Sequence, residues 1–157
     1  MPRNGEALHF TAEELDRTAG ISRAFVLAGR AIFTVSNETT GERYTYRIGA
    51  KPRRENPAEK TYFVSLLAGS DNTSDYRYLG ILDPATLEVR ITGRSTYRAD
   101  SKPVKVVAWA LRHVGASRPF PAGYALRHAG RCGHCGRLLT VPESIDSGFG
   151  PICLGGM

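Results

Sequence analysis

Strict alternation between apolar and polar residues is the feature that most constrains how this chain can fold. In the segment RYTYRI, residues 43–48, tyrosine and isoleucine alternate with arginine and threonine. This period of two predicts a β-strand with one face on a core and the other, carrying Arg43 and Arg47, in solvent. The segment therefore indicates a sheet that is buried on one side only.

Four further segments have the composition of strands. They are residues 31–37, 61–69, 76–82 and 89–95, and mostly short polar segments separate them. Strands joined by hairpin-length loops pair with their neighbours in sequence, so we expect an antiparallel sheet of about five strands. Residues 51–60, KPRRENPAEK, are interpreted as a polar loop.

Helices are predicted on either side of these strands. Residues 10–20 have the spacing of a capping box, and residues 104–115 place valine, alanine and leucine on one helical face. Trp109 is expected in the core. The fold class is therefore α+β: an antiparallel sheet packed with one or two helices forms a body at residues 1–115. A proline-containing linker is expected at residues 116–126.

Composition limits the class of partner. No apolar run approaches the roughly 18 residues of a membrane span, so we expect no membrane contact. No apolar leader opens the chain, which favours a reducing cytoplasm, where cysteines bind metal more often than they pair. The net charge is +6, and 17 of the 21 basic residues are arginine. This balance favours a polyanionic partner, either nucleic acid or an acidic protein surface.

The three cysteines lie close to the C-terminal end. Cys132 and Cys135 have the spacing of a zinc knuckle, and the predicted short capped helix with a turn after it can return Cys153 to the same ion. The alternatives are free thiols or a redox CxxC motif. A redox motif usually opens a helix after a strand, and the sequence provides no such unit here. We therefore expect Zn²⁺ as the cofactor.

We expect the fourth zinc ligand to be a histidine. His128 lies four positions before the first cysteine and reaches the ion from outside the knuckle, whereas His134 lies within the CxxC loop. We favour His128 and keep His134 as the alternative. Three thiolates and one imidazole close the tetrahedron, which predicts a structural site in a small module at residues 127–157.

The tail motif and the body together resemble a known family. Residues 128–153 read HxGxCxxCGRxLTxPESIxxGxGPxC, and the body contains FTVSNETTGERYTYRI and YFVSLLAGSDNTSDYRYLGIL. These stretches are similar to an uncharacterised family of bacteriophage and prophage proteins with a C-terminal zinc-binding domain. The resemblance implies a zinc site and a phage origin, and hence the cytoplasm of an infected host cell. It implies no activity.

Basic residues gather in three parts of the chain: residues 43–60, residues 90–118 and the cysteine tail. Tyr76 and Tyr78 are candidates for stacking surfaces beside an arginine stripe, although we favour the interpretation that they line the core. The candidate nucleic-acid-binding residues are Arg43, Arg47, Arg53, Arg54, Arg90, Arg94, Arg98, Arg131 and Arg137.

No catalytic arrangement accompanies these basic residues. The sequence contains no Ser-His-Asp order, phosphate loop or HExxH motif, so we expect a protein that is not an enzyme. The favoured function is binding of single-stranded or structured nucleic acid without catalysis. The alternative is a phage inhibitor of a host defence complex, similar in action to an anti-CRISPR protein, that works by protein–protein binding. The sequence leaves the oligomeric state open.

Overall fold

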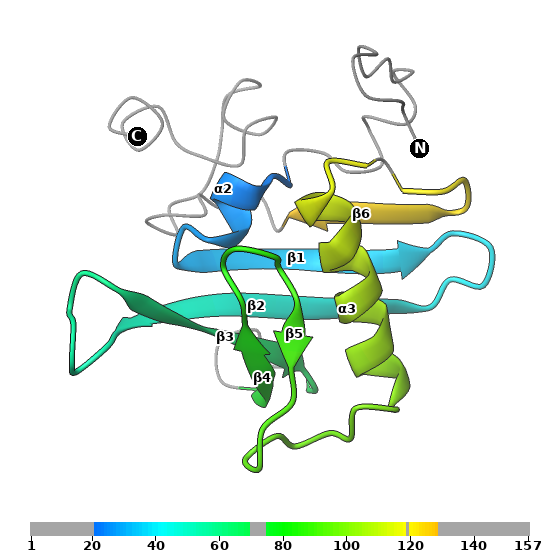
Figure 1. The fold of residues 1–157 in the computed structure, drawn as a ribbon. Helices are drawn as coiled ribbons and strands as arrows, with labels where there is room; N and C mark the ends of the chain where they lie inside the picture. Colours follow the sequence, from blue (N-terminus) through cyan, green and yellow to red (C-terminus); the bar gives the residue numbers. More distant parts are fainter. Residues whose placement is uncertain (1–20, 70–74, 119, 129–157) are drawn as a thin grey trace.

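One antiparallel sheet of six strands forms the frame of the protein (Figure 1). The computed structural model describes residues 21–69, 75–118 and 120–128. The spatial order of the strands is β5-β4-β3-β2-β1-β6, and every neighbouring pair is antiparallel. The strands are β1 (Arg30–Asn37), β2 (Arg43–Pro52), β3 (Lys60–Leu67), β4 (Tyr76–Leu82), β5 (Val89–Arg90) and β6 (Tyr124–His128).

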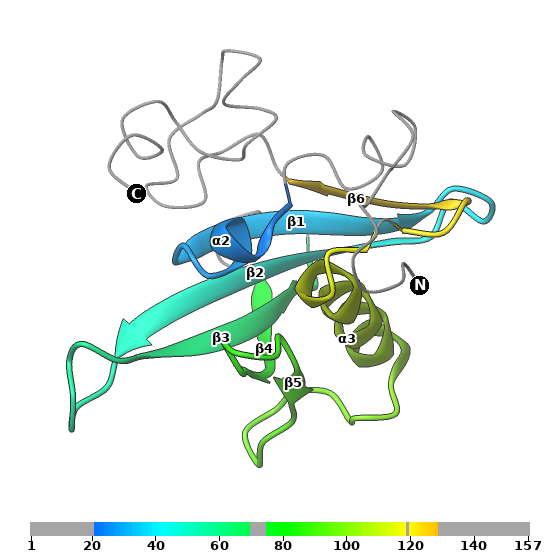
Figure 2. The same cartoon turned by 45° about the horizontal axis from the view of Figure 1, so that its top comes forward.

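Two helices lie against the same face of the sheet, so the α+β class is confirmed (Figures 1 and 2). Helix α2 (Arg23–Val26) begins after Ser22, whose hydroxyl accepts a hydrogen bond of 3.2 Å from the amide of Phe25. Helix α3 (Lys102–Gly115) carries a proline in its first turn, where a missing amide proton costs nothing. The helix expected at residues 10–20 lies outside the described residues. No helix in the described ranges has the length and apolar character needed to cross a membrane.

The core lies between α3 and the sheet. Tyr46 is fully buried, and its hydroxyl donates a hydrogen bond of 2.6 Å to the carbonyl of Pro103 at the start of α3. Trp109 is only partly buried, and its ring packs 4.9 Å from that of Phe120 and 5.0 Å from that of Tyr124. The face that α3 buries consists of Val104, Val107, Ala110, Leu111 and Val114.

The strand ends differ from the sequence prediction most in β2 and β5. β2 continues to Pro52, so the first two residues of the expected polar loop belong to a strand. β5 contains only two residues, because the chain turns immediately after it. The amide of Thr92 donates to the hydroxyl of Ser95 at 2.9 Å, and the amide of Ser95 donates to the carbonyl of Thr92 at 3.0 Å. These local bonds replace the sheet pairing expected as far as residue 95.

The expected linker at residues 116–126 contributes to the body instead. Its Phe120 is 1% exposed and Leu126 is fully buried. β6 pairs with β1 over five residues, from Phe33 opposite His128 to Asn37 opposite Tyr124. Five strands were expected, and this short strand is the sixth. Since β6 completes the edge of the sheet, the described body extends to residue 128.

Candidate nucleic-acid interface

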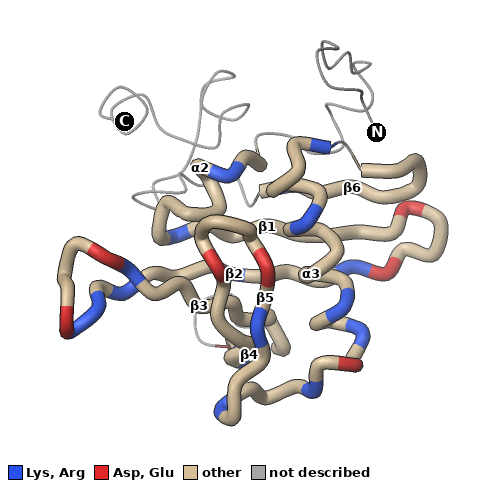
Figure 3. Tube along the Cα trace, in the orientation of Figure 1, with Lys and Arg blue, Asp and Glu red and all other residues tan. Residues whose placement is uncertain are grey.

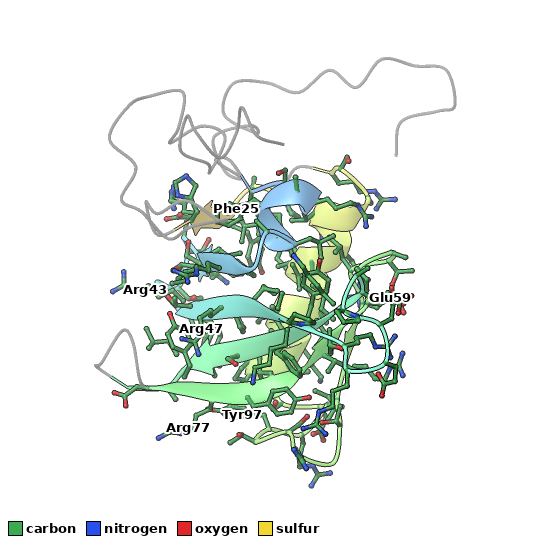
Figure 4. The ribbon with its side chains drawn as sticks, turned by 90° about the vertical axis from the view of Figure 1, so that its left-hand side faces the viewer. Phe25, Arg43, Arg47, Glu59, Arg77 and Tyr97 are labelled. Carbon is green, nitrogen blue, oxygen red and sulfur yellow. The ribbon has the colours of Figure 1, made fainter. Side chains whose placement is uncertain are left out.

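The side of the sheet that faces away from α2 and α3 is the open face, and no helix covers it among the described residues (Figure 2). The alternation in β2 determines which residues lie there. Tyr46 and Ile48 are fully buried toward the helices, so Arg43, Arg47 and Gly49 point the opposite way. Figure 4 shows the arginines at 43 and 47 on the side of the sheet away from α3. The prediction that these two arginines share a strand face is confirmed.

Acidic residues are absent from all six strands of the described structure. The acids of the described residues lie in the turns and connections instead (Figure 3). Since each acid would offset a positive charge, the strands themselves carry a net positive charge, which acids in the flanking turns offset only in part, as Glu38 does for Arg127. The basic residues of the strands are Arg30, Arg43, Arg47, Lys51, Lys60, Arg77, Arg90 and Arg127.

Arg47 stacks on an aromatic ring of the open face. Its guanidinium carbon lies 4.2 Å from the centroid of the Tyr76 ring. Burial raises the pKa of the Tyr76 phenol, and the positive charge of Arg47 opposes part of that rise. The stack fixes the plane of the guanidinium, so less side-chain freedom is lost when the group binds a phosphate.

Two further rings lie on the same face. Phe63 and Tyr78 meet edge to face, with their ring centroids 6.2 Å apart. The hydroxyl of Tyr78 lies 3.0 Å from the hydroxyl of Thr92, close enough for a hydrogen bond in either direction. Both rings are partly exposed. The face therefore combines cations with aromatic rings that are held in place, the pairing of groups used by proteins that bind single strands.

The prediction that Tyr76 and Tyr78 line the core is wrong, because a β-bulge shifts the faces of β4. Val64 of β3 pairs with Gly80, but the next residue, Ser65, pairs with Tyr78. Leu79 is the extra residue, and it is fully buried. An extra residue exchanges the two faces of a strand, so both tyrosines move to the open face while Leu82 stays in the core.

A groove of about 630 Å³ runs over the open face. Lys51 stands beside it, with its ammonium nitrogen 5.9 Å from the centroid of the Phe63 ring. Cross-strand register brings these residues together from β1, β2, β3 and β4, which alternation within one strand does not reveal. The residues around the groove are Gly29, Arg30, Ile32, Arg47, Gly49, Ala50, Lys51, Phe63, Ser65 and Tyr78.

The β2–β3 hairpin holds two of the other predicted arginines. Arg53 forms an exposed ion pair of 3.1 Å with Glu59, and Arg54 is exposed beside it. Arg53 also lines a second groove of about 460 Å³, together with Arg90 of β5 and Asp83. Because two acids, Glu59 and Asp83, line this second groove, its positive charge is partly offset.

The remaining predicted arginines lie farther along the chain. Arg94 and Arg98 follow β5 in the segment that leads to α3. The Nε of Arg98 lies 3.4 Å from Oδ1 of Asp100, as an exposed ion pair. Two whole strands, β3 and β4, separate β5 from β2 in the sheet. Arg131 and Arg137 lie outside the described residues. The structure thus places Arg43 and Arg47 together on β2, Arg53 and Arg90 at the second groove, and Arg94 and Arg98 in the segment after β5.

His128 is the only predicted zinc ligand within the described residues. It is the last residue of β6, where it pairs with Phe33, and its ring centroid lies 5.7 Å from that of Phe25 in α2. The three cysteines lie outside the described residues. Within the described ranges, no group of three or more histidine, cysteine, aspartate or glutamate residues is placed to hold a metal ion. The zinc site therefore stays a prediction.

Comparison with known proteins gives one match, at the C-terminal end. The model of a family of unknown function, DUF6011, matches residues 126–157. Searches of curated proteins and of solved structures found no match to the chain. The matched residues begin within β6 and extend over the cysteine-containing tail, so this part of the chain is similar to an uncharacterised family.

Proposed function

We propose that this protein binds single-stranded or structured nucleic acid on the open face of its sheet, without catalysis. One observation carries the proposal: the six strands contain basic residues and no acid, and the open face presents Arg43 and Arg47 beside partly exposed rings. Phosphates need cations that are free of competing carboxylates, and bases need flat apolar surfaces. The open face offers both.

The second part of the proposal concerns the tail. We propose that residues 127–157 form a module stapled by one structural zinc ion, with His128, Cys132, Cys135 and Cys153 as ligands. The spacing of the ligands supports it, since tetrahedral zinc prefers thiolate and imidazole. The family match supports a unit of this extent, because it begins at residue 126. Arg131 and Arg137 would add positive charge beside the knuckle.

Fluorescence anisotropy with a short labelled single strand tests the binding, and the key variant is Arg43→Glu combined with Arg47→Glu. We expect this pair to weaken binding to all sequences alike, because phosphate contacts carry no sequence information. On single strands each phosphate contact adds about 0.7 to the salt dependence of log affinity, so loss of two contacts should reduce the slope by about 1.4.

A matched control changes the net charge by the same amount, but on the opposite side of the sheet. Lys105→Glu combined with Arg112→Glu alters two exposed residues of α3, the helix that covers the other face of the sheet. We expect this control to retain the salt slope and most of the affinity. An equal loss from both pairs would show that net charge alone, rather than the open face, determines binding.

The alternative is that the basic strands bind an acidic protein surface. For a phage protein in an infected cytoplasm, such a surface would belong to a host defence complex. A protein interface of this kind would give a stable complex with a host protein that survives nuclease treatment. If that complex forms and no oligonucleotide binds at low salt, the inhibitor hypothesis replaces the proposed function.

A further inference from the structure

A glycine in the interior of β2 lies directly beneath the groove on the open face. Glycine weakens a strand interior, so its presence there usually marks a bulge, a bend, or the close approach of another group. The pairing of β2 with β3 is continuous through Gly49, which lies opposite Phe63, and on the other side Gly49 forms the last pair of the β1–β2 ladder, opposite Arg30. Positive backbone φ angles occur at Gly29, Gly41 and Gly123 among the described glycines, but not at Gly49. Neither a bulge nor a left-handed turn therefore explains this glycine.

Close packing within the protein does not explain it either. A Cβ atom added to Gly49 would meet no heavy atom within 4 Å in the described structure. Gly80 of β4 shows the contrast, because a Cβ atom there would collide with the backbone carbonyl of Arg90. The ring of Phe63, although it belongs to the paired residue, does not cover Gly49. The space above Gly49 is thus open to a molecule from outside.

We propose that this space is a stacking site for one base of a single-stranded nucleic acid. The inference rests on the proposed function and specifies the class of ligand. The base would lie over Gly49 and stack against the aromatic pair of Phe63 and Tyr78. Arg47 and Lys51, on either side of Gly49 along β2, would hold the adjoining phosphates.

Three features of the groove favour a base over an apolar protein side chain. Three cations, Arg30, Arg47 and Lys51, line the groove, and among the described residues no acid does. The volume of about 630 Å³ leaves room for a planar base with its sugar. The Tyr78 hydroxyl lies within hydrogen-bond distance of Thr92, so the ring is held for stacking before a ligand arrives. In a duplex the base faces are already stacked on one another and cannot stack on the protein, so the groove would bind a single strand in preference to a duplex.

The test fills the space without changing any charge. Gly49→Val places a branched side chain in the groove at a strand position that favours such residues, so we expect its thermal unfolding temperature to be retained or raised. Binding of a thymidine oligomer of about ten nucleotides should weaken on the order of tenfold, the loss expected when one base no longer stacks. Thr45→Val is the control, because it places the same side chain on the open face of β2 outside the groove.

An abasic oligomer of the same length separates the two proposals. It retains the phosphates and lacks the bases, so we expect it to bind wild type more weakly than the thymidine oligomer does. We also expect the abasic oligomer to bind Gly49→Val and wild type with equal affinity. Equal binding of both oligomers by wild type, with no effect of Gly49→Val, would overturn the stacking site and leave phosphate binding intact. Failure of both oligomers to bind at low salt would overturn the proposed function itself. Loss of a protein partner in Gly49→Val, with oligomer binding unchanged, would assign the groove to a protein side chain and overturn the stacking site.

Discussion

The guanidinium of Arg47 lies over the ring of Tyr76, 4.2 Å from its centroid. The two residues come from β2 and β4, strands that do not pair with each other, because β3 lies between them. The stack therefore crosses the intervening strand. It joins the charged part of the open face to its aromatic part.

Replacement of Arg47 by lysine should separate charge from stacking. Lysine keeps the positive charge but lacks the planar group, so we expect the free energy of unfolding to fall by about 0.5–1 kcal/mol, the usual value of an exposed cation–π contact. Urea denaturation measures this change. Arg43→Lys is the control, since Arg43 is an exposed residue of the same strand. We expect the free energy of unfolding to change less in this variant. Equal changes in both variants would mean that the stack adds no stability.

Alkaline pH should destabilise the protein through Tyr46. Burial, with a smaller contribution from nearby Tyr44, raises the pKa of the Tyr46 phenol far above its ordinary value of 10. Below pH 10 both the folded and the unfolded states keep the proton. Above pH 10 the phenol of Tyr46 ionises in the unfolded chain but not in the folded protein, so the free energy of unfolding falls progressively as pH rises. Each pH unit above 10 should cost about 1.4 kcal/mol for this one group.

The variant Tyr46→Phe tests that assignment. It lacks the hydrogen bond to the carbonyl of Pro103, so we expect it to be less stable than wild type at neutral pH by about 1 kcal/mol. Its loss of stability between pH 10 and pH 11 should nevertheless be smaller. Urea denaturation at a series of pH values measures both effects. The same slope in wild type and variant would show that other tyrosines dominate alkaline unfolding.

Truncation of a buried residue in β6 should destabilise the whole sheet. Leu126 is fully buried, so Leu126→Ala leaves a cavity and should lower the free energy of unfolding by about 2–5 kcal/mol. Arg127→Ala provides the comparison: Arg127 is exposed and pairs with Glu38 at 3.0 Å, a contact of less than about 1 kcal/mol. If hydrogen exchange shows loss of protection in β6 alone, this strand does not unfold together with the sheet.

Removal of a zinc ligand should affect the tail and the sheet edge together. We expect one zinc ion per chain by elemental analysis, and weaker retention in His128→Ala than in His134→Ala. The reverse order would identify His134 as the fourth ligand. The linker interpretation predicts that Cys135→Ser unfolds only the tail. Since His128 ends β6, we now expect Cys135→Ser also to reduce hydrogen-exchange protection in residues 124–128.

The sequence predicts those parts of the fold that depend on local pattern. Alternation in β2 correctly placed Tyr46 toward the core and Arg43 and Arg47 away from it, because burial on one face imposes a period of two. β6 was missed because it is short and follows a segment with two prolines, a composition typical of connections. Its pairing partner, β1, is distant in the sequence.

The candidate site was predicted less well, because it depends on register between strands. The faces of Tyr76 and Tyr78 follow from an extra residue at Leu79. The one local signal of that bulge is Gly80, a glycine inside the strand, and it does not say which residues change face. Phe63 and Gly49 face each other only once β2 and β3 are aligned. The arginines were recognised as a class, but their distribution over separate strands and turns required the structure.

The pairing of β1 with β6 has a consequence for the order of folding. Phe33 and His128 are paired although they lie 95 positions apart in the sequence, whereas every other neighbouring pair of strands in the described sheet is consecutive in sequence. During synthesis the strands from β1 to β5 leave the ribosome first, so their hairpins form while one edge of β1 still lacks its partner. The nascent protein must therefore keep an unpaired edge from associating with other chains until residue 128 emerges.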